Sequence, residues 1–137
     1  MNLAIISVGS NIEPLENIVQ ASKALAEMGW LVSVSAFRRT KPEGMTAQPD
    51  FLNGAFYIRT PLNQSDLESR LKEMESYQGR VRTSNRNAPR SIDLDIVAFN
   101  GEIIDSDYYR YPFVKEAVDE IFSQIRSKQW KKTIRVA

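Results

Sequence analysis

Residues 90–99 read Arg-Ser-Ile-Asp-Leu-Asp-Ile-Val-Ala-Phe. β-Branched, aliphatic and aromatic residues dominate this stretch, which predicts a β-strand. Because successive side chains of a strand point to opposite faces, Asp93 and Asp95 share one face. The other face carries isoleucine and leucine side chains and is able to pack into a core. The strand therefore presents a pair of carboxylates on one side and apolar groups on the other.

The paired carboxylates favour a metal site. Two carboxylates this close repel each other, and burial does not stabilise them unless a cation lies between them. Proteins commonly hold Mg²⁺ with one or two carboxylates, and substrate phosphates complete the coordination. Asp-x-Asp also arises by chance, and on an exposed strand it would be a solvated face. Aspartate is unfavoured in strands, so two on one face of a central strand point to a bound cation.

An arginine-rich stretch precedes this strand and carries Arg80, Arg82, Arg86 and Arg90. It is polar and bounded by Gly79 and Pro89, which predicts that a helix ends at the glycine and a mobile loop follows. Arginines on such a loop suit a lid that closes over phosphates. A solvated loop with no ligand is the alternative. No aromatic residues alternate with the arginines, which disfavours a surface for nucleic-acid stacking.

Composition excludes several kinds of chemistry. The chain of 137 residues has a net charge of +1 and contains neither cysteine nor histidine. Disulfides, thiol nucleophiles, histidine triads and imidazole zinc sites are therefore excluded, and catalysis must use carboxylates, lysine, tyrosine or a metal. The near-neutral charge gives no general attraction to nucleic acids, and no apolar run approaches a membrane span. We expect a single cytoplasmic domain over residues 1–137 with no nucleic-acid or membrane partner.

Hydrophobic periodicity predicts an α+β fold. Strands are expected at residues 3–7, 30–37, 51–58 and 90–99, with helices from 14 to 28 and from Asn63 or Ser65 to Gly79. Asn100-Gly101 predicts a small hairpin, and an apolar stripe from 114 to 125 predicts a C-terminal helix before a weakly ordered basic tail after Lys128. This order predicts a ferredoxin-like βαββαβ antiparallel sheet with helices on one face, plus the hairpin and the last helix.

Two further motifs have a structural and a functional interpretation. Gly9-Ser10-Asn11 follows a strand and precedes a helix, so it is either a turn with a helix cap or a ligand contact. Phe51 and Asn53 share a strand face, where an aromatic ring beside an amide would hold a flat heterocycle. Packing of Phe51 into the core is the alternative.

Taken together, these segments resemble the 6-hydroxymethyl-7,8-dihydropterin pyrophosphokinase family of folate biosynthesis. The resemblance runs from Met1 to about Asp105. Its landmarks are Val-Gly-Ser-Asn at 8–11, Arg-Thr at 39–40, Gln-Pro-Asp-Phe-Leu-Asn at 48–53, Gln-Gly-Arg-Val-Arg at 78–82 and Pro-Arg-Ser-Ile-Asp-Leu-Asp at 89–95. The last is the most specific of them.

The resemblance implies a monomeric enzyme that binds ATP, a pair of Mg²⁺ ions and a pterin. It implies transfer of pyrophosphate from ATP to the pterin hydroxymethyl group, with release of AMP and without a covalent intermediate. By position, Asp93 and Asp95 would hold the metal ions. The resemblance also assigns phosphate contacts and catalysis to Arg80, Arg82 and Arg90, the nucleotide to Glu75, Arg86 and Ile96, and the pterin to Thr40, Phe51 and Asn53.

Several positions depart from the family pattern. Pro112 is followed by Phe113 where the family has histidine, and Asp119 lies near the position of an arginine. An aspartate there would reverse a charge beside the nucleotide, worth about 4 kcal/mol at ~4 Å and an effective dielectric of about 20. Ile121 or Phe122 would have to replace the second stacking aromatic. The alternative function is a divergent homologue that binds pterin or nucleotide with weak or no catalysis.

Overall fold

The sheet of this protein is covered on both faces. The computed structural model describes residues 1–42, 47–82 and 91–137, with only the backbone at 80–82. The elements in the described ranges are β1 (Asn2–Ser10), α1 (Pro14–Glu27), β2 (Leu31–Val34), β3 (Arg38–Thr40), β4 (Phe51–Thr60), α2 (Gln64–Arg82), β5 (Asp93–Phe99), β6 (Glu102–Ile103), α3 (Asp107–Arg110) and α4 (Pro112–Ser127). The sheet has the strand order β2-β4-β1-β5-β6, with β3 also pairing with β4, and these pairings are antiparallel.

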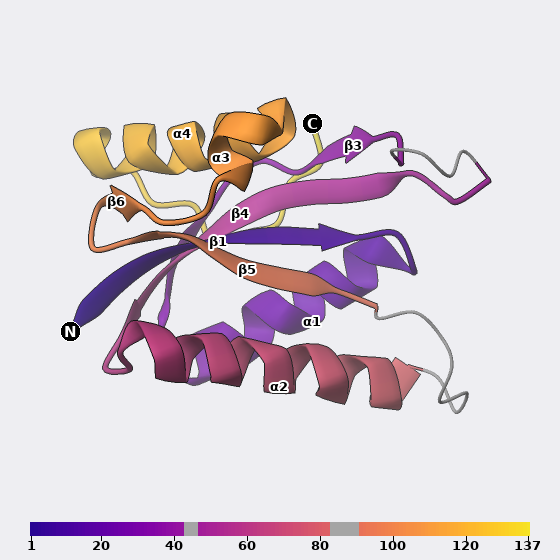
Figure 1. Ribbon diagram of the computed structural model, residues 1–137, viewed down its shortest axis with the longest axis horizontal. Coiled ribbons are helices and arrows are strands. Elements are labelled where there is room, and N and C mark those ends of the chain that lie inside the picture. The colour runs from indigo at the N-terminus through magenta and orange to yellow at the C-terminus, as the bar shows by residue number, and fades with distance from the viewer. Residues whose placement is uncertain (43–46, 83–90) are drawn as a thin grey trace.

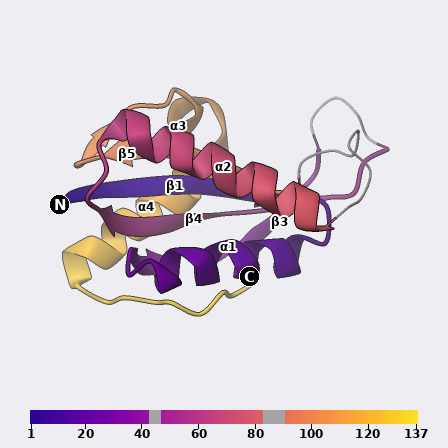
Figure 2. The ribbon, with the colours of Figure 1, turned by 90° about the horizontal axis from the view of Figure 1, so that it is seen from below.

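Helices α1 and α2 cover one face of the sheet, whereas α3 and α4 cover the other (Figures 1 and 2). The βαββαβ order with α1 and α2 on one face confirms the predicted α+β ferredoxin-like fold. The C-terminal helix adds a third layer to it.

Local sequence signals explain where α1 and α2 begin and where α1 ends. Pro14 occupies the first turn of α1, where the missing N–H of proline costs nothing. Gly29, with φ 78°, follows the end of α1 in the left-handed conformation that glycine adopts easily. Asn63 caps α2, because its Oδ1 accepts the backbone N–H of Asp66 at 2.8 Å. Of the two predicted caps, Asn63 is thus the one that the structure uses.

The end of α2 differs from the prediction. The helix continues through Gly79 to Arg82, so the predicted stop at Gly79 is wrong. A glycine ends a helix when its backbone turns left-handed, and the helical hydrogen-bonding pattern persists at Gly79 instead. Arg80 and Arg82 therefore lie on the last turn of α2 rather than on a loop, and the rest of the predicted loop, with Arg86 and Arg90, lies outside the described residues.

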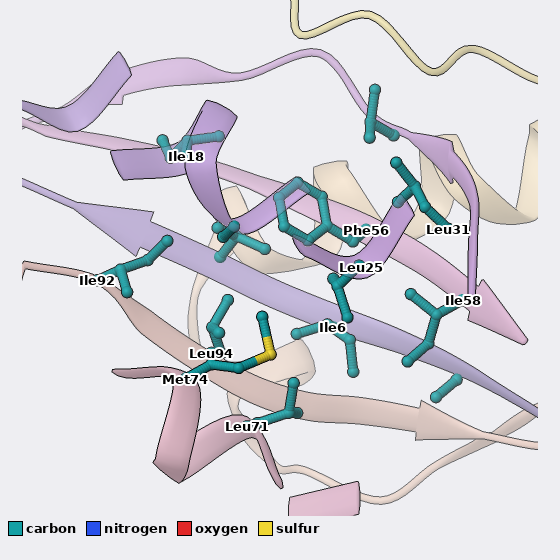
Figure 3. Close-up of a cluster of buried hydrophobic side chains, with 14 of the residues drawn as sticks. Ile6, Ile18, Leu25, Leu31, Phe56, Ile58, Leu71, Met74, Ile92 and Leu94 are labelled. Atoms are coloured by element: carbon teal, nitrogen blue, oxygen red, sulfur yellow. The ribbon is translucent and has the colours of Figure 1, made fainter. Parts of the chain in front are cut away.

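Two hydrophobic cores hold the sheet between its helical layers. The larger one packs the sheet against α1 and α2, and its members include Ile6, Ile18, Leu25, Phe56, Leu71, Met74 and Leu94 (Figure 3). The smaller one packs Ile5, Tyr57 and Val97 against α4 and includes Val114, Val118 and Ile121. Complete burial of one such aliphatic side chain contributes about 1.5–3 kcal/mol. Because β1 contributes to both cores, the strands at the centre of the sheet are fixed from both sides.

The C-terminal segment lies along the outer edge of the sheet. The backbone N–H of Val34 donates to the carbonyl of Lys131 at 2.6 Å, and that of Phe37 donates to the carbonyl of Arg135 at 2.8 Å. These bonds fall at the break between β2 and β3. The strand predicted at 30–37 therefore ends early, at Val34, and β3 begins beyond the predicted range, at Arg38, with the tail beside the break. The expectation of a weakly ordered tail is wrong, because the tail satisfies backbone groups that an edge strand would leave unpaired.

Candidate active site

A cavity of about 240 Å³ lies on the face of the sheet that α3 and α4 cover. It is lined by Ser7, Gly9, Thr40, Lys41, Pro42, Phe51, Asn53, Asp93, Asp95, Asp107, Tyr111, Phe113 and Val114. The predicted metal-binding pair and all the predicted pterin-binding residues are among them. Segments far apart in the sequence thus meet around one space, which we call the main cavity.

The register of the central strands explains this convergence. Gly9 of β1 lies opposite Asn53 of β4 on one side and opposite Asp93 of β5 on the other. Ser7 lies opposite Asp95 in the same way. Paired residues of neighbouring strands share a face, so Asn53 and Asp93 lie in one row across the sheet, and Asp95 lies on the same face two residues further along β5.

Gly9 makes room for the Asn53 side chain. A Cβ atom at Gly9 would lie only 2.7 Å from Asn53 Oδ1. The neighbouring Ser10 is buried and its hydroxyl donates to the carbonyl of Ser91 at 2.5 Å, which ties the end of β1 to the chain before β5. The motif at residues 9–11 therefore has a packing role at the cavity.

Polar and aromatic groups suited to a flat ligand face each other at one end of the main cavity. Asn53 Nδ2 donates to Thr40 Oγ1 at 2.5 Å, and Thr40 is paired with Phe51 across β3 and β4. Phe51 is partly exposed and lines the cavity, so it is not a buried core residue. An aromatic ring next to an amide and a hydroxyl forms an apolar surface with a polar edge, the arrangement expected for a heterocycle site.

A second aromatic wall comes from the start of α4. The rings of Tyr111 and Phe113 stack with centroids 5.4 Å apart and an interplanar angle of 28°, and both line the main cavity. Ile121 and Phe122, which were expected to replace the second stacking aromatic, do not line the main cavity: Ile121 is buried in the smaller core and Phe122 packs against that core. Aromatic residues cluster around Pro112 in the sequence, and this cluster is the signal that could have predicted Tyr111 at the site.

Asp119 is neutralised by its neighbours. Its Oδ2 lies 2.7 Å from the Lys115 ammonium, and its Oδ1 accepts the Tyr108 hydroxyl at 2.5 Å. Partial burial works to raise the pKa of Asp119, but the hydrogen bonds from Lys115 and Tyr108 outweigh it and the pKa is lowered. Asp119 does not line the main cavity, and Lys115 offsets its negative charge, so the charge at this position is smaller than the sequence alone implied.

The acidic part of the main cavity has a donor set that suits a hard cation. Asp93 and Asp95 lie on the same face, and Asp107, which sequence reasoning missed, faces the same space from α3. Partial burial and then the charges of Asp105 and Asp95 raise the pKa of Asp107. Within the described ranges no group of three or more potential ligands is close enough to bind a metal ion without help. The carboxylate pair nevertheless fits Mg²⁺, which takes most of its remaining ligands from phosphates and water.

Lys72 of α2 joins this acidic group from the side. Its ammonium lies 3.2 Å from Asp95 Oδ1 and 3.3 Å from Glu75 Oε2. Burial works to lower the pKa of Lys72, but the charges of Asp95 and Glu75 outweigh it and the pKa is raised. The ammonium therefore stays protonated at neutral pH.

Glu75 and Ile96 lie on the opposite side of the sheet from the main cavity. Glu75 is buried, and its Oε2 accepts the backbone N–H of Leu94 at 2.7 Å, which links α2 to β5. Ile96 belongs to the larger core and borders a second cavity of about 330 Å³ between α2 and the sheet edge at β5, which we call the edge cavity. Asp95 lines both cavities and so connects them.

Comparisons with known proteins identify the family to which the chain is similar. The family described as 7,8-dihydro-6-hydroxymethylpterin-pyrophosphokinase (HPPK) matches residues 5–123. The 2-amino-4-hydroxy-6-hydroxymethyldihydropteridine pyrophosphokinase of Haemophilus influenzae is 37% identical over 115 residues, covering 82% of this chain and 71% of that protein. The protein of the same name from Bacillus subtilis is 34% identical over 138 aligned residues, covering 93% and 82%. Its counterpart from Pseudomonas aeruginosa is 37% identical over 110 residues, covering 78% and 67%.

Among the described helices, none combines the length and the apolar character needed to cross a bilayer.

Proposed function

Because the chain belongs to the 7,8-dihydro-6-hydroxymethylpterin-pyrophosphokinase family, we propose that it transfers pyrophosphate from ATP to the hydroxymethyl group of 6-hydroxymethyl-7,8-dihydropterin. The observation that carries the proposal is the shared cavity. Asp93 and Asp95 line the same space as Phe51 and Asn53, so a metal-bound phosphate chain and a flat acceptor would meet there.

The pterin would occupy the aromatic end of the main cavity. Its ring would lie between Phe51 and the wall formed by Tyr111 and Phe113, and its polar edge would bond to Asn53 and Thr40. Stacking of this kind contributes about 0.5–1.5 kcal/mol beyond the area buried. Such a slot would also exclude water from the hydroxymethyl oxygen.

The metal ions would be held by Asp93 and Asp95 together with phosphate oxygens. When bound, Mg²⁺ neutralises charge on the phosphates and polarises them toward attack. The carboxylates fix the position of the phosphate chain relative to the acceptor, and Asp107 adds negative charge that favours cation binding.

The nucleotide would extend from Asp95 into the edge cavity. This cavity is lined by Ile96 and Lys72, which provide an apolar surface and a cation for the phosphates. Arg80, Arg82, Arg86 and Arg90 would neutralise the remaining phosphate charge. Glu75 would act through the backbone of β5, because its carboxylate accepts the N–H between the two aspartates.

The transfer itself needs positioning and charge neutralisation rather than a covalent intermediate. The hydroxymethyl oxygen attacks the β-phosphorus and forms a new P–O bond. The bond from that phosphorus to the α–β bridging oxygen breaks, and AMP leaves with the bridging oxygen. The hydroxyl proton passes to a carboxylate or to water, since the chain contains no histidine.

The direct test is AMP formation from ATP, Mg²⁺ and 6-hydroxymethyl-7,8-dihydropterin. Asp95→Ala is the matched inactive control, and we expect it to lower the rate by at least about a hundredfold, since metal ligation supplies several kcal/mol of charge stabilisation. Wild-type protein that forms no AMP at high enzyme concentration would contradict the proposal.

A non-catalytic binding function is the second candidate, and it is favoured by one observation. Phe113 lines the main cavity where the family pattern has a histidine. A binding protein would show pterin or nucleotide affinity by calorimetry while forming no AMP. Calorimetry and the AMP assay together therefore distinguish the two functions.

A further inference from the structure

Lys72 contacts one carboxylate of the proposed metal site. Its ammonium bridges Asp95 and Glu75 across the gap between α2 and β5, at 3.2 Å and 3.3 Å. The side chain is 45% exposed, and it is therefore able to move. Its partner Glu75 is 1% exposed and is fixed by the N–H of Leu94.

An ammonium and a metal ion compete for the same oxygen. Mg²⁺ binds carboxylate oxygens at about 2.0–2.1 Å, and a second cation in contact with the same oxygen would repel it. The Lys72 ammonium must therefore leave Asp95 Oδ1 before Asp95 ligates a metal through that atom. Glu75 remains as a partner, so this movement does not leave the ammonium without a counter-ion.

A nucleotide would offer the ammonium a new partner. Lys72 and Asp95 both line the edge cavity, so phosphates entering this space would face both groups. The triphosphate of a nucleotide carries more negative charge than one carboxylate, and its oxygens form strong charge-assisted hydrogen bonds with lysine. Phosphates thus provide both the metal ligands and the site to which the ammonium moves.

We propose that Lys72 is a positioning residue that occupies Asp95 in the free protein and makes metal binding depend on nucleotide. The inference rests on the proposed function, because it requires Asp95 to be a metal ligand. Lys72 thereby favours binding of nucleotide-bound Mg²⁺ over free Mg²⁺.

The test is titration of the protein with Mg²⁺ by calorimetry, first alone and then with a non-hydrolysable ATP analogue. Lys72→Met removes the charge, Lys72→Gln removes it but keeps a donor for Glu75, and Lys72→Arg keeps the charge. Arg70→Met is the matched control, because Arg70 lies on the same helix and pairs with Glu73 instead.

Without nucleotide, we expect Lys72→Met and Lys72→Gln to bind Mg²⁺ about two- to fivefold more tightly, the range that a half-exposed ion pair supports. Lys72→Arg and Arg70→Met should resemble wild type. With the analogue present this gain should disappear, so nucleotide increases Mg²⁺ affinity less in the two neutral variants than in wild type.

Two results would overturn the inference alone. One is an unchanged Mg²⁺ affinity in both neutral variants, and the other is an equal change in Arg70→Met, which would reveal a general charge effect. If wild-type protein bound no Mg²⁺ even with the analogue, both the inference and the proposed function would fail. Thermal unfolding of each variant checks that the fold is retained.

Discussion

Substitution of Gly9 by alanine should separate pterin binding from stability. The added Cβ would lie 2.7 Å from Asn53 Oδ1, which is too close, whereas the nearest backbone atom, the carbonyl oxygen of Leu52, is 4.0 Å away. The atom that must move is the end of a side chain, so the strand itself is able to stay in place. The displaced amide would lose its hydrogen bond to Thr40.

The expected magnitudes differ between the two properties. Loss of one partly buried hydrogen bond costs about 1 kcal/mol of unfolding free energy, and the alanine side chain restores part of that by reducing the entropy of the unfolded chain. For the pterin, a bound polar edge left without its amide partner costs about 2 kcal/mol, which is about thirtyfold in affinity.

Calorimetric titration with 6-hydroxymethyl-7,8-dihydropterin in the presence of Mg²⁺ and an ATP analogue measures this effect. Gly79→Ala is the control, because a Cβ there meets nothing within 4 Å and should stabilise α2 by about 0.5–1 kcal/mol without changing pterin affinity. The reasoning would be refuted if Gly9→Ala bound the pterin as tightly as wild type, or if its affinity for the nucleotide analogue fell as much as its affinity for the pterin.

Three further substitutions test other parts of the structure. Phe113→Ala should lower the affinity for the pterin about tenfold, because it removes one stacking surface, and calorimetry should show an unchanged affinity for the nucleotide. Gly54→Ala should destabilise the fold by about 3 kcal/mol in chemical denaturation, because its Cβ would lie 2.6 Å from the fully buried Phe37 ring. The pKa of Asp119 is lowered on folding, so its contribution to stability is complete above the unfolded pKa and is lost as pH falls through the folded value. Asp119→Asn should therefore lose less stability than wild type between about pH 5 and 2. The difference should be less than about 1 kcal/mol, because the pair with Lys115 is exposed. Identical dependence of the unfolding free energy on pH in the two proteins would contradict this.

Much of the fold follows from local patterns in the sequence. Apolar alternation around Asp93 predicted β5 and the face on which its carboxylates lie, and the cap at Asn63 predicted the start of α2. The register across the central strands then brings Phe51, Asn53 and the aspartates to one cavity. The predictions of β5 and of the start of α2 were confirmed because the tertiary structure leaves these local signals unchanged.

Errors arose where long-range contacts decide the outcome. The tail after Lys128 is polar and basic, and only its backbone bonds to Val34 and Phe37 fix it, which no local pattern reveals. Asp119 was judged as an isolated charge, because the positions of Tyr108 and Lys115 around it depend on how α3 packs on α4. The helical conformation of Gly79 was missed for a related reason, since glycine permits a helix end without requiring one.

The hydrogen bond from Leu94 to Glu75 has a mechanical consequence. The amide that donates it lies between the two aspartates, and the acceptor belongs to a helix packed on the opposite face. The backbone spacing between the two aspartates is therefore fixed before any cation arrives, so the backbone of β5 should reorganise little on binding. A small shift of α2 would instead move both acidic groups together. Mutations in α2 that lie far from the carboxylates should therefore be able to alter cation affinity.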